Sequence, residues 1–129
     1  MREGVKHLPE KRLDLFLTTL EKSEKHYSPT TMYEDYAVDA RHFHWQSQST
    51  TSEASPTGQR YIHHAAMGYR PLLFVREVPR RNTYTQPYAY LGELEYRSHE
   101  GSRPISFVWH MKHEMPARIL RISKRLAAA

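Results

Sequence analysis

The 129-residue chain contains no cysteine. It therefore has no disulfide framework, no thiolate zinc site and no cysteine nucleophile. It also lacks an apolar run of membrane-spanning length and an N-terminal signal-peptide pattern, so we expect a cytoplasmic protein that does not associate with membranes. The signature motifs of serine hydrolases, P-loop enzymes and zinc proteases are missing too. We therefore expect no enzymatic activity, no metal and no cofactor.

The composition is that of one small, polar and basic domain. Hydrophobic residues make up 39% of the chain, the formal net charge is +5 and the pI is about 9.6. This length supports a single modest core, and the basic balance favours a polyanionic partner. The basic character is concentrated near the C-terminus, where only Glu100 and Glu114 oppose seven cations: Arg97, Arg103, Lys112, Arg118, Arg121, Lys124 and Arg125.

We expect one domain over residues 1–125 and set aside residues 126–129, which resemble a vector-derived tail. The spacing of apolar residues predicts an N-terminal helix over about residues 8–25. A β-rich core follows over about residues 36–111, and residues 112–125 form a basic segment with a final helix or turn. Before the core, residues 32–38 fit either a short helix or a strand.

The core segment alternates in a way that is typical of strands. Gly92 interrupts one of them and predicts a bulge or a close approach. The class is therefore α+β, with a small, mostly antiparallel sheet that is strongly curved or closed and is flanked by helices. The strands are predicted over 43–48, 72–78, 88–98 and 105–111, a short helix over about 56–66 and a polar loop over 79–86.

Residues 43–51 hold the most informative local pattern, Phe-His-Trp-Gln-Ser-Gln-Ser-Thr-Thr. The segment begins like a core strand, but after Trp45 the alternation stops and four neutral hydrogen-bonding side chains follow. An indole beside amides and hydroxyls suits a flat, uncharged ligand such as a nucleobase, and Gln59, Arg60 and Tyr61 would complete the pocket. The same residues also fit a core tryptophan with a solvated polar tail, and residue types alone favour that interpretation.

Two other clusters are less informative. The turn at residues 96–104 combines serine, histidine, glycine and arginine, which suits phosphate binding but also an ordinary polar hairpin turn. Ser98 and His99 are neighbours that point to opposite faces of a strand, so we expect no catalytic pair there. His42 and His44 share one face, as in some metal sites, but no acidic or cysteine partner stands at a recognisable spacing.

Several segments occur together and in order, at residues 28–36, 43–49, 56–61, 72–77 and 98–104. In combination they resemble the C-terminal domain of unknown function carried by large bacterial proteins with phospholipase-D-like nuclease and superfamily-two helicase modules. Several such proteins are type IV, modification-dependent restriction enzymes, in which this domain is regarded as the target-recognition module. The resemblance covers about residues 23–120.

The resemblance implies recognition of double-stranded DNA that carries 5-methyl- or 5-hydroxymethylcytosine, with nuclease or helicase modules as further partners. It also implies a PUA-like or SRA-like curved β-barrel that extrudes the base into a pocket. This chain has no nuclease or helicase segment, so we expect an excised domain or a stand-alone reader that does not cut DNA. Residues Trp45 to Ser49 then become a base site, and Phe43 is left to the core.

The candidate residues fall into two groups. We expect side chains that stack on the base or read its edge to be Trp45, Gln46, Gln48, His44, Ser47, Tyr33, Tyr61, Tyr90 and Ser98. We expect the DNA backbone to be held by Ser49, Arg60, Arg80, Arg81, His99, Arg103, Arg118 and Lys124. Two alternatives stay open: a module that docks onto a helicase or nuclease protein, and a small nuclease, which the missing acidic metal cluster disfavours.

Overall fold

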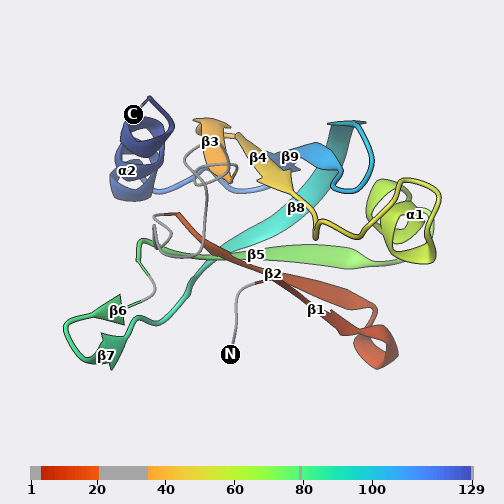
Figure 1. Cartoon of the computed structure of the whole chain (residues 1–129), viewed down its shortest axis with the longest axis horizontal. Coiled ribbons are helices and arrows are strands. Elements are labelled where there is room, and N and C mark those ends of the chain that lie inside the picture. The colour runs from red at the N-terminus through yellow and green to blue at the C-terminus, as the bar shows by residue number, and fades with distance from the viewer. Residues whose placement is uncertain (1–3, 21–34, 79, 129) are drawn as a thin grey trace.

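The computed structural model describes residues 4–20, 35–78 and 80–128 of the chain (Figure 1). In this part of the chain, no helix is long and apolar enough to cross a membrane. The elements in chain order are β1 (Gly4–Leu8), the 3-10 helix η1 (Pro9–Lys11), β2 (Leu13–Thr19), β3 (Tyr36–Asp39), β4 (His42–Gln46), α1 (Pro56–Ile62), β5 (Arg70–Arg76), β6 (Arg80–Arg81), β7 (Tyr84–Thr85), β8 (Ala89–Glu100), β9 (Ser106–Met111) and α2 (Ala117–Ala128).

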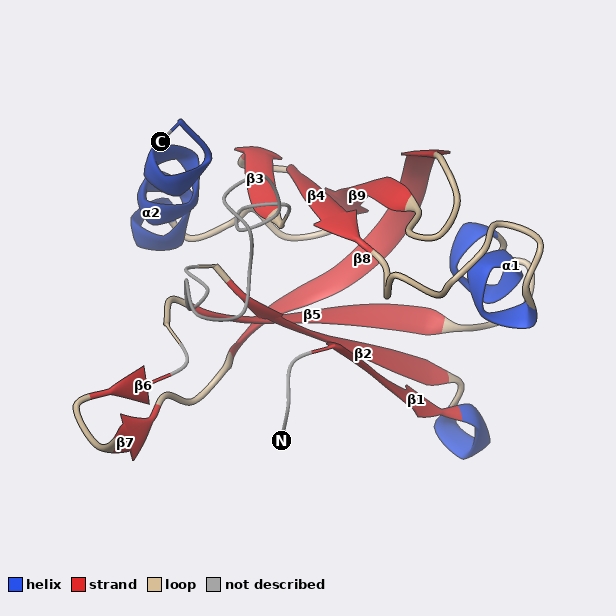
Figure 2. Ribbon diagram, in the orientation of Figure 1, coloured by secondary structure: helices blue, strands red, loops and turns tan. Residues whose placement is uncertain are grey.

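Seven strands form one sheet in the order β1-β2-β5-β8-β9-β4-β3, and β6 and β7 form a separate hairpin. β2 and β5 are parallel, whereas all other neighbours in this order are antiparallel. The first half of the long strand β8 pairs with β5 and its second half with β9. The sheet therefore folds over along β8 into two layers, one of β1, β2 and β5 and the other of β9, β4 and β3 (Figure 2).

The α+β class and the mostly antiparallel sheet are confirmed, but the sheet is not closed into a barrel. β1 and β3 stand at its two ends and do not pair with each other. The curvature comes from β8, which bends between the layers, and from two irregularities in its pairing with β5 and β9. Bulges of this kind bend a strand and increase its local twist, so these two irregularities account for the bend in the sheet.

An aromatic cluster joins the two layers. The ring of Phe16 on β2 lies 4.5 Å from that of Trp45 on β4 and 5.3 Å from that of Trp109 on β9. Tyr61 of α1 closes the cluster at 5.4 Å from Phe16, and all four side chains are buried. Aromatic pairs at such distances contribute about 0.5–1.5 kcal/mol each beyond their burial, so this cluster is the centre of the core.

The predicted N-terminal helix is wrong, because residues 4–8 and 13–19 are strands and residues 9–11 a single 3-10 turn. The spacing of Leu13, Phe16 and Leu17 fits a helix, but the same short apolar run also fits a strand. β2 lies inside the sheet and pairs with β1 on one side and β5 on the other. Hydrogen bonding to two neighbours overrides the local pattern. Residues 21–25 of the predicted helix lie outside the described residues.

The other predicted elements agree with the structure more closely. The strand β9 and the helix α1 fall within the segments predicted for them, and β4, β5, β8 and α2 overlap theirs but extend one to three residues beyond the predicted bounds. The undecided segment at residues 32–38 contributes β3, and the predicted polar loop at 79–86 contains the β6–β7 hairpin. Gly92 has a φ of +109° at the irregularity between β5 and β8, so the predicted bulge is confirmed. A Cβ there would lie 2.8 Å from the ring of His113, so the close approach is confirmed as well.

Candidate nucleic-acid interface

The two polar loops predicted to bind DNA lie against each other. We call residues 46–55 and 98–106 together the polar edge. Ser47 and Ile105 exchange two bonds: the Ser47 N–H donates to the Ile105 carbonyl, and the Ile105 N–H donates to the Ser47 Oγ, both at 2.9 Å. The Arg103 N–H donates to the Thr51 carbonyl and the Glu53 N–H to the Ser102 Oγ, again at 2.9 Å. The hydroxyls of Ser47 and Ser102 thus help to fix one loop to the other.

A bulge in β8 directs His99 to the polar edge. Tyr96 pairs with Trp109 and Ser98 with Val108, so one extra residue of β8 turns His99 to the same face as Tyr96. The His99 Nε2–H donates to the Glu53 carboxylate, and the Tyr96 hydroxyl donates to His99 Nδ1 at 2.7 Å. His99 therefore spans the two loops, while Ser98 is exposed on the opposite face.

Trp45 lies beneath the polar edge and not on its surface. Its side chain is 4% exposed and belongs to the aromatic cluster. Tyr61 is buried with it, and burial raises the pKa of the Tyr61 hydroxyl to about 12. In this conformation neither ring has an exposed face on which a base could stack. The base-binding role of Trp45 and Tyr61 therefore stays a prediction.

The other predicted residues of this segment have mixed environments. The amide of Gln46 reaches Ser106 at 3.4 Å, and the Gln48 side-chain oxygen accepts from Thr51 at 3.2 Å. The ring of His44 stacks on Tyr36 with 4.7 Å between centroids. The exposed members of the predicted set at this edge are Gln48, Ser49, Ser98 and Arg103.

Arg60, predicted to hold phosphate, is committed to the fold. Its guanidinium donates two bonds to the Asp14 carboxylate of β2, at 2.8 and 3.0 Å, and the two side chains are only 11% and 3% exposed. Burial alone lowers the pKa of Arg60, but the bonds and charge of Asp14 raise it above its ordinary value on balance. α1 is also pressed onto the preceding loop, since a Cβ at Gly58 would lie 2.3 Å from the Ser52 carbonyl oxygen.

A second region lies at the other end of the molecule, between α2 and the ladder of β5 and β8. It is a cavity of about 410 Å³, which we call the basic cleft. α2 is held beside it because the Ala37 N–H of β3 donates to the buried Ser123 Oγ at 2.6 Å. The cleft is lined by Leu20, Val75, Arg76, Glu77, Gln86, Pro87, Ala89, Arg118, Ile119 and Ile122.

The β6–β7 hairpin continues directly from the rim of the basic cleft. Glu77 lines the cleft just before β6, and Gln86 lines it just after β7. The hairpin carries Arg80, which is exposed, and Tyr84, which is 73% exposed. Figure 1 places the hairpin and α2 at one end of the long axis and α1 with its preceding loop at the other. The predicted backbone-binding residues are therefore divided between two distant regions.

The remaining predicted residues are distributed as follows. Arg118 lies on α2 and pairs with Glu77 at 3.4 Å, and Tyr90 is 55% exposed beside Phe74. Arg81 belongs to β6 and Lys124 to α2, whereas Tyr33 lies outside the described residues. The cleft residues that the sequence did not single out include Gln86, Ala89, Ile119 and Ile122. The spacing of Ile119 and Ile122 on a helix with Arg118 and Arg121 was the available signal, because it separates an apolar from a basic face.

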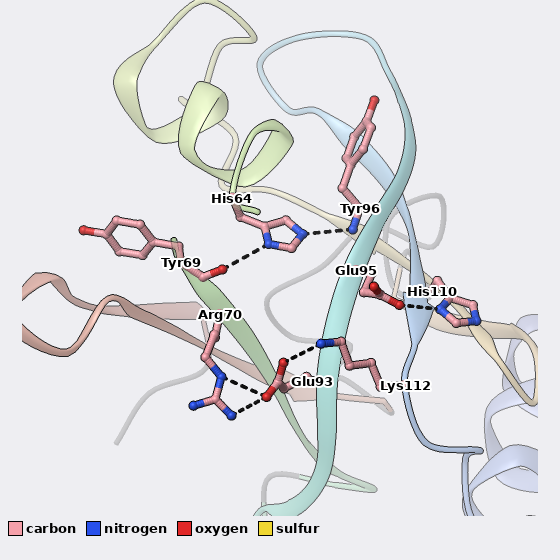
Figure 3. Close-up of polar contacts among 8 residues, drawn as sticks. All are labelled: His64, Tyr69, Arg70, Glu93, Glu95, Tyr96, His110 and Lys112. Atoms are coloured by element: carbon pink, nitrogen blue, oxygen red, sulfur yellow. Dashed lines mark hydrogen bonds and ion pairs between the residues drawn. The ribbon is translucent and has the colours of Figure 1, made fainter. Parts of the chain in front are cut away.

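The histidines in the described part of the chain do not gather into a metal site. No group of three or more histidine and acidic side chains in the described ranges is placed to hold a metal ion. His64 has a structural role (Figure 3): its Nδ1–H donates to the Tyr69 carbonyl at 3.1 Å, and its Nε2 accepts from the Tyr96 N–H at 3.0 Å. It thereby ties the turn after α1 to β8 at its bulge. Burial lowers the pKa of His64.

We predict an acid-dependent loss of stability from His64. The unfolded chain takes up the proton near pH 6.5, whereas the folded chain resists it, so stability falls with acid from about pH 6.5 down to the lowered folded-state pKa, by up to about 1.4 kcal/mol per pH unit. Urea unfolding between pH 7.5 and 5 should show a flatter pH dependence for His64→Gln than for the wild type. His63→Gln, at an exposed neighbour, should keep the wild-type dependence. An unchanged slope in His64→Gln would contradict the assignment.

Comparison with known families gives one match. A family described as a domain of unknown function, DUF3427, matches residues 2–122, which is nearly the whole chain. A search of curated proteins found no match.

Proposed function

The chain belongs to the DUF3427 family of domains of unknown function. We propose that it binds double-stranded DNA, which its geometry supports, and that it prefers DNA carrying a modified cytosine, which the resemblance described above implies. The observation that carries the proposal is the basic cleft, a cavity large enough for a base that Arg76 and Arg118 line. Further cations lie on the two elements that adjoin it, the hairpin and α2. Arg80 comes from the hairpin, and Arg118 and Arg121 come from α2.

The charges at this end suit a phosphate backbone. Arg80 and Arg121 are exposed and form no ion pair with any described residue, and Arg80 donates only to the Thr83 carbonyl. Arg118 and Arg121 are three residues apart on α2, so they are neighbours on the helix surface. Arginines at such positions hold phosphates and set the register of the duplex without reading its sequence. Tyr84, on the same hairpin as Arg80, is exposed and can stack on a base.

The finer parts of the proposal come from the resemblance described above. We propose that the domain is the specificity module of a modification-dependent restriction system and works with nuclease and helicase modules. We propose further that the folded-over sheet is an open relative of the PUA-like or SRA-like barrels and that the target base is extruded. The modification would be 5-methyl- or 5-hydroxymethylcytosine. Extrusion costs a few kcal/mol, least where the pair is already weakened.

The proposal predicts salt-dependent binding with a preference for modified duplexes. Fluorescence anisotropy with matched duplexes should give roughly 10-fold tighter binding when the cytosine carries the added methyl, the size of discrimination that one methyl in an apolar pocket provides. Arg80→Ala with Arg121→Ala should weaken binding to all duplexes and reduce the slope of log affinity against log salt by about 2, one for each lost phosphate contact.

The control is Lys6→Ala with Lys11→Ala, which removes two exposed cations from β1 and η1. This variant should keep both the affinity and the salt slope. Equal affinity for modified and unmodified duplexes would eliminate modified-base recognition. Absence of DNA binding together with a stable complex with a nuclease or helicase protein would instead support a docking module.

A further inference from the structure

We infer that the basic cleft is the receptor for the extruded cytosine, and that Gln86 reads its hydrogen-bonding edge. This inference rests on the proposed function and names its site. The cleft volume of about 410 Å³ falls in the range of roughly 300–1,000 Å³ that is usual for small-ligand sites. A pyrimidine base with its sugar is a ligand of that kind, and the basic rim provides for the phosphates on either side of it.

The lining of the cleft consists of an apolar wall and a polar rim. Leu20 and Val75 are each 2% exposed and form the base of the wall, and Ile119 and Ile122 of α2 pack against the same core. An added methyl at C5 of cytosine gains free energy when it leaves water for such a wall. The hydroxymethyl group would gain less, because its hydroxyl needs a partner.

Gln86 supplies donors and an acceptor on the rim. Its side-chain amide forms no hydrogen bond with any other described residue, although its backbone carbonyl accepts from Arg76 at 3.4 Å. An amide presents an acceptor and a donor side by side, and cytosine presents N4–H and N3 in the complementary order. Glu77, which also lines the cleft and pairs with Arg118 at 3.4 Å, bears a carboxylate that accepts hydrogen bonds but does not donate. A carboxylate near this edge favours the N4 amino group of cytosine over the O4 oxygen of thymine.

Arg76 contributes a planar guanidinium to the lining of the same cleft. Its guanidinium lies over the ring of Tyr88 at 4.4 Å and donates to the Thr19 Oγ1 at 2.9 Å, so its plane is held in place. Guanidinium planes stack on bases as well as on aromatic rings. The cleft thus combines a planar group, an apolar wall and an unengaged amide, the three features needed to hold a base outside the helix. The polar edge has an unengaged surface at Ser49, but its tryptophan is buried.

The experiment compares variants of the cleft with matched variants of the polar edge. Gln86→Leu removes the reading amide, and Ala89→Phe narrows the cavity. Gln48→Leu and Ser49→Phe make the same kinds of change at the polar edge. For each variant, anisotropy gives the ratio of affinities for modified and unmodified duplexes. A 2-aminopurine beside the target cytosine reports extrusion, because its fluorescence rises when its neighbour leaves the stack.

In this inference the unmodified duplex is held through its backbone without extrusion, so its base does not meet Gln86. We therefore expect each cleft variant to lower the affinity ratio about tenfold while binding to the unmodified duplex changes less than twofold. The polar-edge variants should keep the wild-type ratio, and circular dichroism should show every variant folded. A wild-type preference that survives in the cleft variants but is lost in the polar-edge variants would overturn the inference and leave the proposed function intact. A wild-type preference without a fluorescence rise would also overturn it, since the base would then be read in the groove. If the wild type showed no preference for the modified duplex, both the inference and the proposed recognition of a modified base would be wrong.

Discussion

Replacing Trp45 with alanine is expected to destabilise the fold by about 3–5 kcal/mol. The indole is 4% exposed and lies within 6 Å of Phe16, Tyr61 and Phe107, so its removal leaves a cavity between the two layers of the sheet. Domains of this size are stable by only about 5–15 kcal/mol. The variant should therefore have a greatly reduced urea midpoint, and much of it would be unfolded at physiological temperature.

Tyr90→Ala is the matched control, because it removes an aromatic side chain that is 55% exposed. Its stability should lie within about 0.5 kcal/mol of the wild type. Urea unfolding followed by circular dichroism measures both variants. If Trp45→Ala instead kept its stability and lost binding to modified DNA, Trp45 would be a ligand-stacking residue and its burial in the core would not describe the binding state.

The segment around Trp45 shows which structural features a local sequence pattern predicts and which it does not. The alternation of Phe43 and Trp45 predicts a strand, and β4 forms there with both side chains buried. The path of the chain after Trp45 is fixed by two long-range contacts, Ser47 with Ile105 and Thr51 with Arg103. No local sequence pattern connects these partners. A row of serines and glutamines has the same composition whether it meets a ligand or another loop. The sequence therefore identified the two loops as candidate ligand-binding segments, but it did not reveal that they bind each other.

The N-terminal segment shows the complementary failure. Leu13, Phe16 and Leu17 satisfy the helical period, and nothing within ten residues excludes a helix. The choice of a strand is made by β5, more than fifty residues away, whose Leu73 pairs with Phe16. Strands that lie between two others gain hydrogen bonds on both sides, and this gain is invisible to a window of local sequence.

The basic cleft could be anticipated only in part. The cations of residues 117–125 and the arginine pair at residues 80–81 were visible in the sequence, and the structure places their elements, α2 and the hairpin, at one end of the molecule. Arg103, from the same basic part of the sequence, lies instead at the polar edge. The cavity itself was not visible in the sequence, because its lining residues Leu20, Gln86 and Ile122 come from three separate segments. A charge distribution can be read from one sequence, whereas a concave surface depends on how distant segments pack.

Breaking the buried ion pair between Asp14 and Arg60 is the second change with a large expected effect. Arg60→Ala leaves the Asp14 carboxylate 3% exposed without its cation, and an uncompensated buried charge of this kind costs about 3–5 kcal/mol. Arg60 also lies over the rings of Tyr61 and Tyr69, at 5.3 and 5.7 Å, so some packing is lost with the charge. The expected result is a large fall in the urea midpoint.

The double variant separates charge from packing. If the cost comes from the unpaired carboxylate, then Asp14→Ala combined with Arg60→Ala should be no less stable than Arg60→Ala alone, because the orphaned charge is removed with its partner. Additive losses would show instead that each side chain acts independently through packing. Arg70→Ala is the control, since Arg70 pairs with Glu93 at the surface (Figure 3) and exposed pairs contribute about 0–1 kcal/mol. A strong coupling confined to the buried pair would mean that Arg60 holds α1 onto β2 and is not free to hold DNA, leaving phosphate binding to the arginines around the basic cleft.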